Sequence, residues 1–146
     1  MFSKSTLVGT LFSFLVLYLL GWFYYGYFAA EFYESHSNIN MESMLPSYIA
    51  LGTLIFSFGF SNLYRKSSNA LNPSKISGFI VGAWIGFTIG FGFNIISFGS
   101  DQSMDLTATL AEAIWCLIYY GLAGASIGWA FQLTGPKKTS FLMGSN

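Results

Sequence analysis

The sequence predicts an all-α fold, an integral membrane four-helix bundle with both termini in the cytoplasm. Of the 146 residues, 53% are hydrophobic and only 8% are charged, whereas a typical soluble domain has about 25% charged residues. Four apolar runs approach the roughly 20 residues that a helix needs to cross a bilayer. The basic residues also alternate with the acidic ones from loop to loop. We therefore expect a single transmembrane domain over residues 1–146, with spans at about 5–30, 46–64, 76–98 and 106–133.

The first predicted span, 5–30, ends in a dense aromatic stretch that begins at Trp22 and includes Tyr24 and Tyr25. Trp and Tyr concentrate at membrane interfaces because each ring is apolar with one polar group. The apolar segment is about 24 residues long, whereas the hydrophobic region of a cleaved signal peptide has about 7–15 residues. We expect it to be retained as a span.

The second predicted span, 46–64, begins at Pro46, and proline is tolerated in the first turn of a helix because the N–H groups there have no partner. Hydroxyl side chains recur along it at Thr53, Ser57 and Ser61. Such groups can donate to a neighbouring helix or to the carbonyl four residues earlier in their own helix. Both alternatives stay open for this row.

The third predicted span, 76–98, has a glycine at every fourth position, and Asn94 continues that row. Glycine costs about 1 kcal/mol relative to alanine in a soluble helix, but in a membrane it lets a second helix approach closely. The fourth span, 106–133, has a small-residue face of its own. We expect these two faces to pack together through Gly78, Gly82, Gly86, Gly90, Gly121, Gly124 and Gly128.

The charges separate by side in this four-span arrangement. The residues on one side are Lys4, Arg65, Lys66, Lys75, Lys137 and Lys138, and those on the other are Glu31, Glu34, Glu42, Asp101 and Asp105. Short loops rich in Lys and Arg stay in the cytoplasm. The pattern therefore predicts a multi-pass protein of the inner (cytoplasmic) membrane.

Glu112 is the only acidic residue inside a predicted span. Buried carboxylates in membranes are costly and usually mark a partner or a site, but this one is expected near the outer boundary, where it could reach water. Three interpretations stay open: an interfacial carboxylate, a structural hydrogen bond and a functional group. With Tyr24, Tyr25 and Asn94, Glu112 could form an outer-facing ligand pocket.

Motifs for catalysis, metal binding and nucleic-acid binding are missing from the sequence. His36 with nearby Glu31 and Glu34 lacks metal-ligand spacing and is better interpreted as part of a solvated acidic loop. Cys116 is the only cysteine, which excludes an intramolecular disulfide. The six basic residues form no basic face. We therefore expect no catalytic residues, no metal, no cofactor and no nucleic-acid partner.

Two aromatic and glycine-rich strings carry a resemblance. They are Gly21-Trp22-Phe23-Tyr24-Tyr25-Gly26-Tyr27-Phe28 and Gly82-Ala83-Trp84-Ile85-Gly86, with Tyr119-Tyr120-Gly121 in the last span. Together they resemble a bacterial family of short four-span membrane proteins of unknown function, over roughly residues 7–133. The resemblance implies the four-span fold and no particular chemistry.

Two functions are compatible with this sequence. The first is a helix-packing or accessory subunit in the lipid bilayer, within a homo-oligomer or among other membrane subunits, and small residues on several helix faces favour it. The alternative is a carrier or binding protein for a small or lipid-like molecule, in the outer pocket around Tyr24, Tyr25, Asn94 and Glu112. An enzyme is not expected.

Overall fold

The structure, a computed structural model, describes residues 3–38, 44–67 and 72–135, and these are helical apart from caps, turns and one isolated β-bridge. Glu42, Lys137 and Lys138, which belong to the predicted charge pattern, lie outside the described residues. The elements are α1 (Lys4–Phe23), the π-helical η1 (Tyr24–Phe28), α2 (Ala30–His36), α3 (Pro46–Ser67), α4 (Lys75–Phe87), the π-helical η3 (Thr88–Phe93), α5 (Asn94–Ser100) and α6 (Leu106–Thr134).

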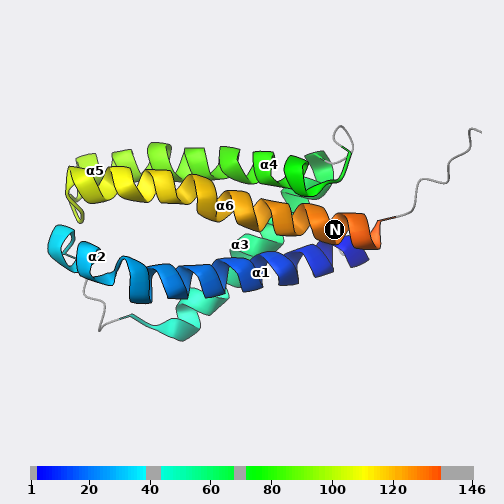
Figure 1. Cartoon of the computed structure of the whole chain (residues 1–146), viewed down its shortest axis with the longest axis horizontal. Coiled ribbons are helices and arrows are strands. Elements are labelled where there is room, and N and C mark those ends of the chain that lie inside the picture. Colours follow the sequence, from blue (N-terminus) through cyan, green and yellow to red (C-terminus); the bar gives the residue numbers. More distant parts are fainter. Residues whose placement is uncertain (1–2, 39–43, 68–71, 136–146) are drawn as a thin grey trace, which may run out of the picture.

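Helix α6 lies at the centre of the bundle, with α1 on one side and α4 on the other, and α3 crosses α1 obliquely (Figure 1). The buried core lies where α1, α3 and α6 meet and consists of Leu17, Phe60, Tyr64, Ala123, Ile127 and Phe131. At one end of the bundle, the buried Tyr64 hydroxyl lies 2.8 Å from the Ser77 Oγ atom. This contact ties the end of α3 to the first turn of α4.

Among the described residues, three helical segments are long and apolar enough to cross a membrane: Lys4–Phe28, Lys75–Ser100 and Leu106–Thr134. They correspond to the first, third and fourth predicted spans, but the first ends at Phe28, before the predicted end at residue 30, because the backbone bends at Ala29. The second, 46–64, forms α3, a helix of 22 residues that is not among these three segments. Its length is sufficient, but the polar side chains of Ser57, Ser61 and Asn62 and the basic pair at its end make it less apolar than the others.

The glycine row of α4 and η3 lies directly against the backbone of α6. A β-carbon on Gly78, Gly82 or Gly86 would collide with the carbonyl oxygens of Gly124, Tyr120 and Cys116, respectively, and one on Gly90 would lie 2.7 Å from the Ala113 oxygen. From α6, Gly124 and Gly128 meet backbone atoms of Gly78 and Ser74, and Gly121 meets the Phe79 ring. On the opposite side of α4, Ile80 and Trp84 are exposed. The two small-residue faces are therefore used within the chain.

A second small-residue contact joins α1 to the C-terminal half of α3. The Ser61 hydroxyl donates to the Thr6 carbonyl at 2.9 Å, and a β-carbon on Gly9 would lie 2.7 Å from the Ser61 Oγ atom. Thr53, in contrast, donates to Ile49 of its own helix at 2.8 Å. The Oγ atom of Ser57 is buried without a hydrogen-bond partner. The hydroxyl row thus shows both expected kinds of bond: Thr53 bonds within its own helix, and Ser61 bonds to a neighbouring helix.

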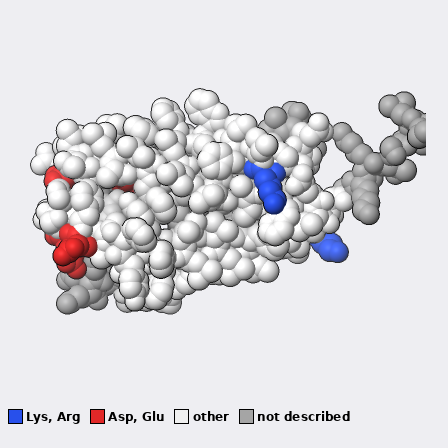
Figure 2. All heavy atoms as spheres, viewed as in Figure 1, with Lys and Arg blue, Asp and Glu red and all other residues white. Residues whose placement is uncertain are grey.

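The charged side chains lie at opposite ends of the bundle, as Figure 2 shows for one face. The acidic ones gather over α2 and the turn between α5 and α6, and the basic ones lie towards the start of α1 and α4. The Nζ atom of Lys75 sits 4.7 Å from the centre of the Trp129 ring, so the cation is held against an aromatic ring at that end of the bundle. Between the two ends, the surface is largely apolar.

Candidate functional site

Glu112 lies on the side of α6 that faces η1 and α2, away from the glycine contact with α4. Tyr25 of η1 and Tyr33 of α2 each donate a hydroxyl hydrogen bond to its carboxylate, one to each oxygen, and the Tyr33 bond is 2.5 Å long. The Cys116 thiol, one turn along α6, lies 3.9 Å from the oxygen that Tyr25 contacts. Of the three interpretations of Glu112, the structural hydrogen bond is the one that these contacts match.

Aromatic rings surround this carboxylate. Tyr24 stacks on Trp115, with 3.8 Å between ring centres and an angle of 9° between planes. Tyr25 and Tyr33 pack against each other with 5.6 Å between their centres, and Tyr33 is only 3% exposed. The Tyr119 hydroxyl donates to the Leu17 carbonyl at 2.6 Å and so joins α6 to α1 on the inner side of the cluster. Both predicted tyrosines are therefore part of this aromatic cluster, and of the two it is Tyr25 that donates a hydrogen bond to Glu112.

Two π-helical segments lie against this turn of α6 from different helices. Segment η1 supplies Tyr24 and Tyr25, and Gly90 of η3 approaches Ala113 and Cys116. A π-helical turn carries an extra residue relative to an α-helix and frequently marks a functional site. The two segments that pack next to residues 112–116 of α6, η1 and η3, are therefore both π-helical and not regular α-helix.

The position of Tyr33 depends on the bend at Ala29. Segment η1 ends there, with backbone angles outside the helical range (φ −114°, ψ 5°), and α2 turns back so that Tyr33 reaches Glu112. Burial and the hydrogen bond to Glu112 both raise the pKa of the Tyr33 hydroxyl. The hydroxyl therefore remains protonated at neutral pH and acts as a donor.

A cavity of about 700 Å³ opens in front of Glu112, Tyr25 and Tyr33. Its walls are one face of α1 and η1, the first two turns of α3, and parts of α2 and α6, and most of its surface is apolar. Leu17 and Gly21 lie on the α1 wall, with Ile49 and Thr53 facing them from α3. The complete lining is Leu17, Tyr18, Gly21, Trp22, Tyr25, Gly26, Ala30, Tyr33, Glu34, Ser37, Met44, Pro46, Ile49, Thr53, Met104, Glu112 and Tyr119. The oblique course of α3 creates this space, because only the C-terminal half of α3 contributes buried residues.

Asn94 lies apart from this cavity. It begins α5, is half-buried, and does not line the cavity at Glu112. Its Nδ2 atom is buried without a hydrogen-bond partner. Of the four residues predicted for the pocket, Tyr25 and Glu112 line the cavity, whereas Tyr24 stacks on Trp115 next to it and Asn94 lies on the other side of α6.

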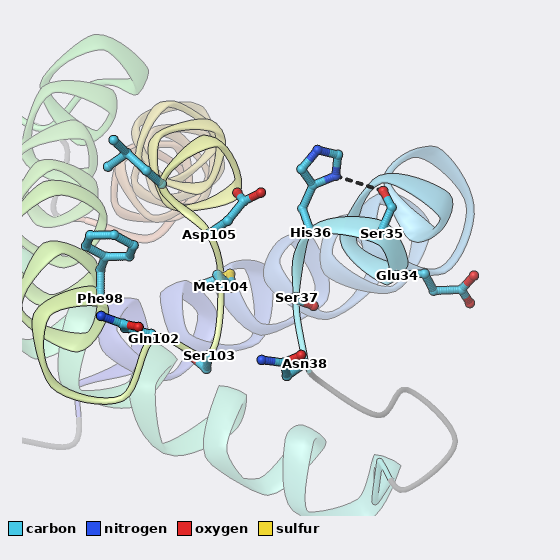
Figure 3. A pocket seen from close by; sticks show the side chains of 11 residues that line it. Glu34, Ser35, His36, Ser37, Asn38, Phe98, Gln102, Ser103, Met104 and Asp105 are labelled. Carbon is cyan, nitrogen blue, oxygen red and sulfur yellow. Dashed lines mark hydrogen bonds between the residues drawn. The ribbon is translucent and has the colours of Figure 1, made fainter.

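A second, more polar hollow of about 550 Å³ lies at the acidic end of the bundle (Figure 3). The segment after α2 pairs there with the segment before α6: Asn38 N–H donates to Ser103 and Asp105 N–H donates to His36, at 2.8 and 2.9 Å. His36 is engaged locally, since its Nδ1 atom lies 2.7 Å from the Ser35 Oγ atom and its ring stacks on Phe32. The described residues contain no group of three His, Cys, Asp or Glu that could hold a metal ion.

Sequence reasoning missed Tyr33 and Trp115. Tyr33 lies beyond the predicted end of the first span, and a continuous helix would have carried it away from Glu112. Trp115 follows Glu112 by three residues, which places both on neighbouring parts of one helix face, and this spacing was the available signal.

Comparison of the chain with protein-family models, with curated proteins and with solved structures found no match. The resemblance to the four-span family stays a prediction.

Proposed function

We propose that this chain binds a small amphipathic molecule in the cavity in front of Glu112. The observation that carries this proposal is the composition of the cavity: a long apolar wall between α1 and α3 ends at one carboxylate held by two tyrosine hydroxyls. Ligand sites are typically concave and mainly apolar, with a few placed polar groups that fix orientation. A volume of about 700 Å³ lies in the range of such sites, about 300–1,000 Å³.

The membrane is the setting we propose for this binding. Three long apolar helices and charges at opposite ends of the bundle support a multi-pass protein of the inner (cytoplasmic) membrane, in which α3 is the fourth crossing. Glu112 would then lie towards the outer face, near the acidic end of the bundle. Membership of the four-span family that the sequence resembles is part of the same proposal.

The glycine contacts weigh against the first function that the sequence suggested. Small residues on several helix faces favour a homo-oligomer or an accessory subunit, and those at Gly78, Gly82 and Gly86 are taken up, as expected, by α6 of the same chain. Packing of this kind is not available to a partner. The binding function therefore has the stronger support.

An extraction experiment tests the proposal. The protein is purified in a mild non-ionic detergent, and small molecules in its organic extract are quantified by mass spectrometry. Thr53 lines the cavity, so Thr53→Trp fills it from the α3 side. Leu54→Trp is the matched control, since Leu54 is 44% exposed and does not line the cavity.

We expect a molecule in stoichiometric amount with the unaltered protein and with Leu54→Trp, and its loss from Thr53→Trp. An extract that is the same for all three proteins, or that holds no such molecule, would contradict binding in this cavity.

One observation still favours the accessory-subunit function as a second candidate. The first turns of α3 expose Tyr48, Leu51 and Ile55, at 71%, 52% and 64%, which is a face that a partner helix could cover. Sizing in mild detergent separates the two functions. A complex that contains other subunits would favour the second candidate, and a monomer that retains a small molecule would favour the first.

A further inference from the structure

We infer that the cavity in front of Glu112 selects organic cations, whose positive charge lies against the carboxylate among the surrounding rings. This inference rests on the proposed binding function and names the class of ligand. It follows from three features of the lining: its charge, its rings and the hydrogen bonds already made by Glu112.

The charge of the described lining has one sign. The lining contains two carboxylates, Glu34 at the acidic end and Glu112 at the inner side. It contains no Lys, Arg or His. An anionic ligand would meet only carboxylates and tyrosine hydroxyls. A cation is complementary to this lining.

The rings favour the same class of ligand. Tyr18, Trp22, Tyr25, Tyr33 and Tyr119 all line the cavity. An aromatic face attracts a cation within about 6 Å of the ring centre, and groups of such rings recognise quaternary ammonium ligands. A quaternary or similarly apolar cation is also cheaper to remove from water than a small, strongly hydrated one.

The hydrogen bonds of Glu112 leave room for a ligand. Each carboxylate oxygen can accept about two hydrogen bonds. Tyr25 and the Cys116 thiol both contact one oxygen, whereas only Tyr33 contacts the other, so the second position on the Tyr33 oxygen is open. Both tyrosines come from the α1–α2 side and fix the orientation of the carboxylate. Glu112 still lines the cavity, so the charge of a bound cation can approach it from the α3 side.

Binding of three matched probes tests the inference. Tetraphenylphosphonium is cationic, tetraphenylborate is an anion of the same shape, and triphenylphosphine oxide is neutral with similar rings. Each is titrated against the full chain in lipid nanodiscs, with empty nanodiscs as the blank for partitioning. We expect tetraphenylphosphonium to bind at least about tenfold more tightly than the other two, a difference of about 1.4 kcal/mol.

Two variants locate the charge selection. Glu112→Gln keeps the shape of the side chain, and we expect it to reduce tetraphenylphosphonium binding to the level of the neutral probe. Glu31→Gln is the matched control, because Glu31 is exposed on α2 and does not line the cavity, and it should bind like the unaltered protein. Thr53→Trp should abolish binding of every probe. Because this variant leaves the hydrogen bonds of Glu112 in place, it still tests the cavity if Glu112→Gln fails to fold.

The outcomes separate the inference from the function on which it rests. Equal binding of the cationic and neutral probes, unchanged by Glu112→Gln but lost in Thr53→Trp, would overturn cation selection and leave the binding cavity. Tight binding of tetraphenylborate alone would also overturn it. If no probe binds above the blank and the extraction experiment finds no molecule, the binding function itself fails.

Discussion

The Tyr33 hydroxyl, on a seven-residue helix, donates a 2.5 Å hydrogen bond to Glu112 in the longest helix of the described chain. This bond fastens α2 to α6 after the bend at Ala29, alongside the backbone hydrogen bonds that join Asn38 to Ser103 and Asp105 to His36. Tyr33→Phe removes the hydroxyl and keeps the ring, so the change separates the hydrogen bonding of Tyr33 from its packing.

We expect Tyr33→Phe to lower the free energy of unfolding by about 2 kcal/mol, because a hydrogen bond to a charged group contributes about 1.5–3 kcal/mol. Thermal unfolding in detergent measures this loss of stability. Tyr27→Phe is the control, since Tyr27 is 74% exposed, and it should leave stability unchanged. Equal melting temperatures for the two variants would show that the Tyr33 bond contributes nothing.

The glycine contact between α4 and α6 predicts that stability depends sharply on side-chain size at these positions. A β-carbon on Gly82 collides with the Tyr120 carbonyl, whereas one on Gly59 of α3 meets nothing within 4 Å. Gly82→Ala should therefore force α4 away from α6 and cost about 1–3 kcal/mol. Gly59→Ala should be neutral or stabilise the helix by up to about 1 kcal/mol. Resistance to unfolding by sodium dodecyl sulfate ranks the two, and the reverse order would exclude backbone contact at Gly82.

The hydroxyl row of α3 gives a matched pair of serines. Ser61 donates to Thr6 of α1, and the buried Ser57 hydroxyl has no partner. We expect Ser61→Ala to cost about 0.6 kcal/mol, the mean for such bonds between membrane helices. Ser57→Ala should be neutral or stabilising, because it removes a buried polar group that is not hydrogen-bonded. A larger loss from Ser57→Ala than from Ser61→Ala would contradict this assignment.

The predicted orientation can be read in intact cells with a membrane-impermeant maleimide. In a Cys116→Ala background, Glu31→Cys marks the acidic end and Asn72→Cys marks the loop between α3 and α4. The positive-inside rule predicts labelling of residue 31 in intact cells and of residue 72 only after permeabilisation. Labelling of both in intact cells would mean that α3 does not cross the membrane.

The contact between α4 and α6 could be predicted from the sequence because it depends on local periodicity. Glycine at every fourth position of 78–90 defines one face whatever the neighbours do, and a second small-residue face was available at Gly121 and Gly124. The three long apolar helices could be predicted from apolar runs with polar ends. Pro46 marks a helix start in the structure as it does in the sequence.

The Glu112 site was only partly predictable, because its geometry depends on departures from regular helices. The π-helical turn at Tyr24–Phe28 shifts the residues after it relative to 3.6-residue periodicity, and the bend at Ala29 returns Tyr33 to the bundle. Neither feature has a sequence signal in a run of aromatic residues. The oblique course of α3, which opens the cavity, arises from packing of its C-terminal half alone. Asn94 was grouped with Glu112 by depth, but it belongs to a different side of α6.

The backbone contact between α4 and α6 has a mechanical consequence. The two helices touch through carbonyl oxygens and glycine α-carbons over most of this contact, with the Phe79 ring at Gly121 as a side chain between them, so little of the contact can change through rotamers alone. Helix α3 has no such attachment over its first turns. On its α3 side, the width of the cavity in front of Glu112 therefore depends on the tilt of this one helix.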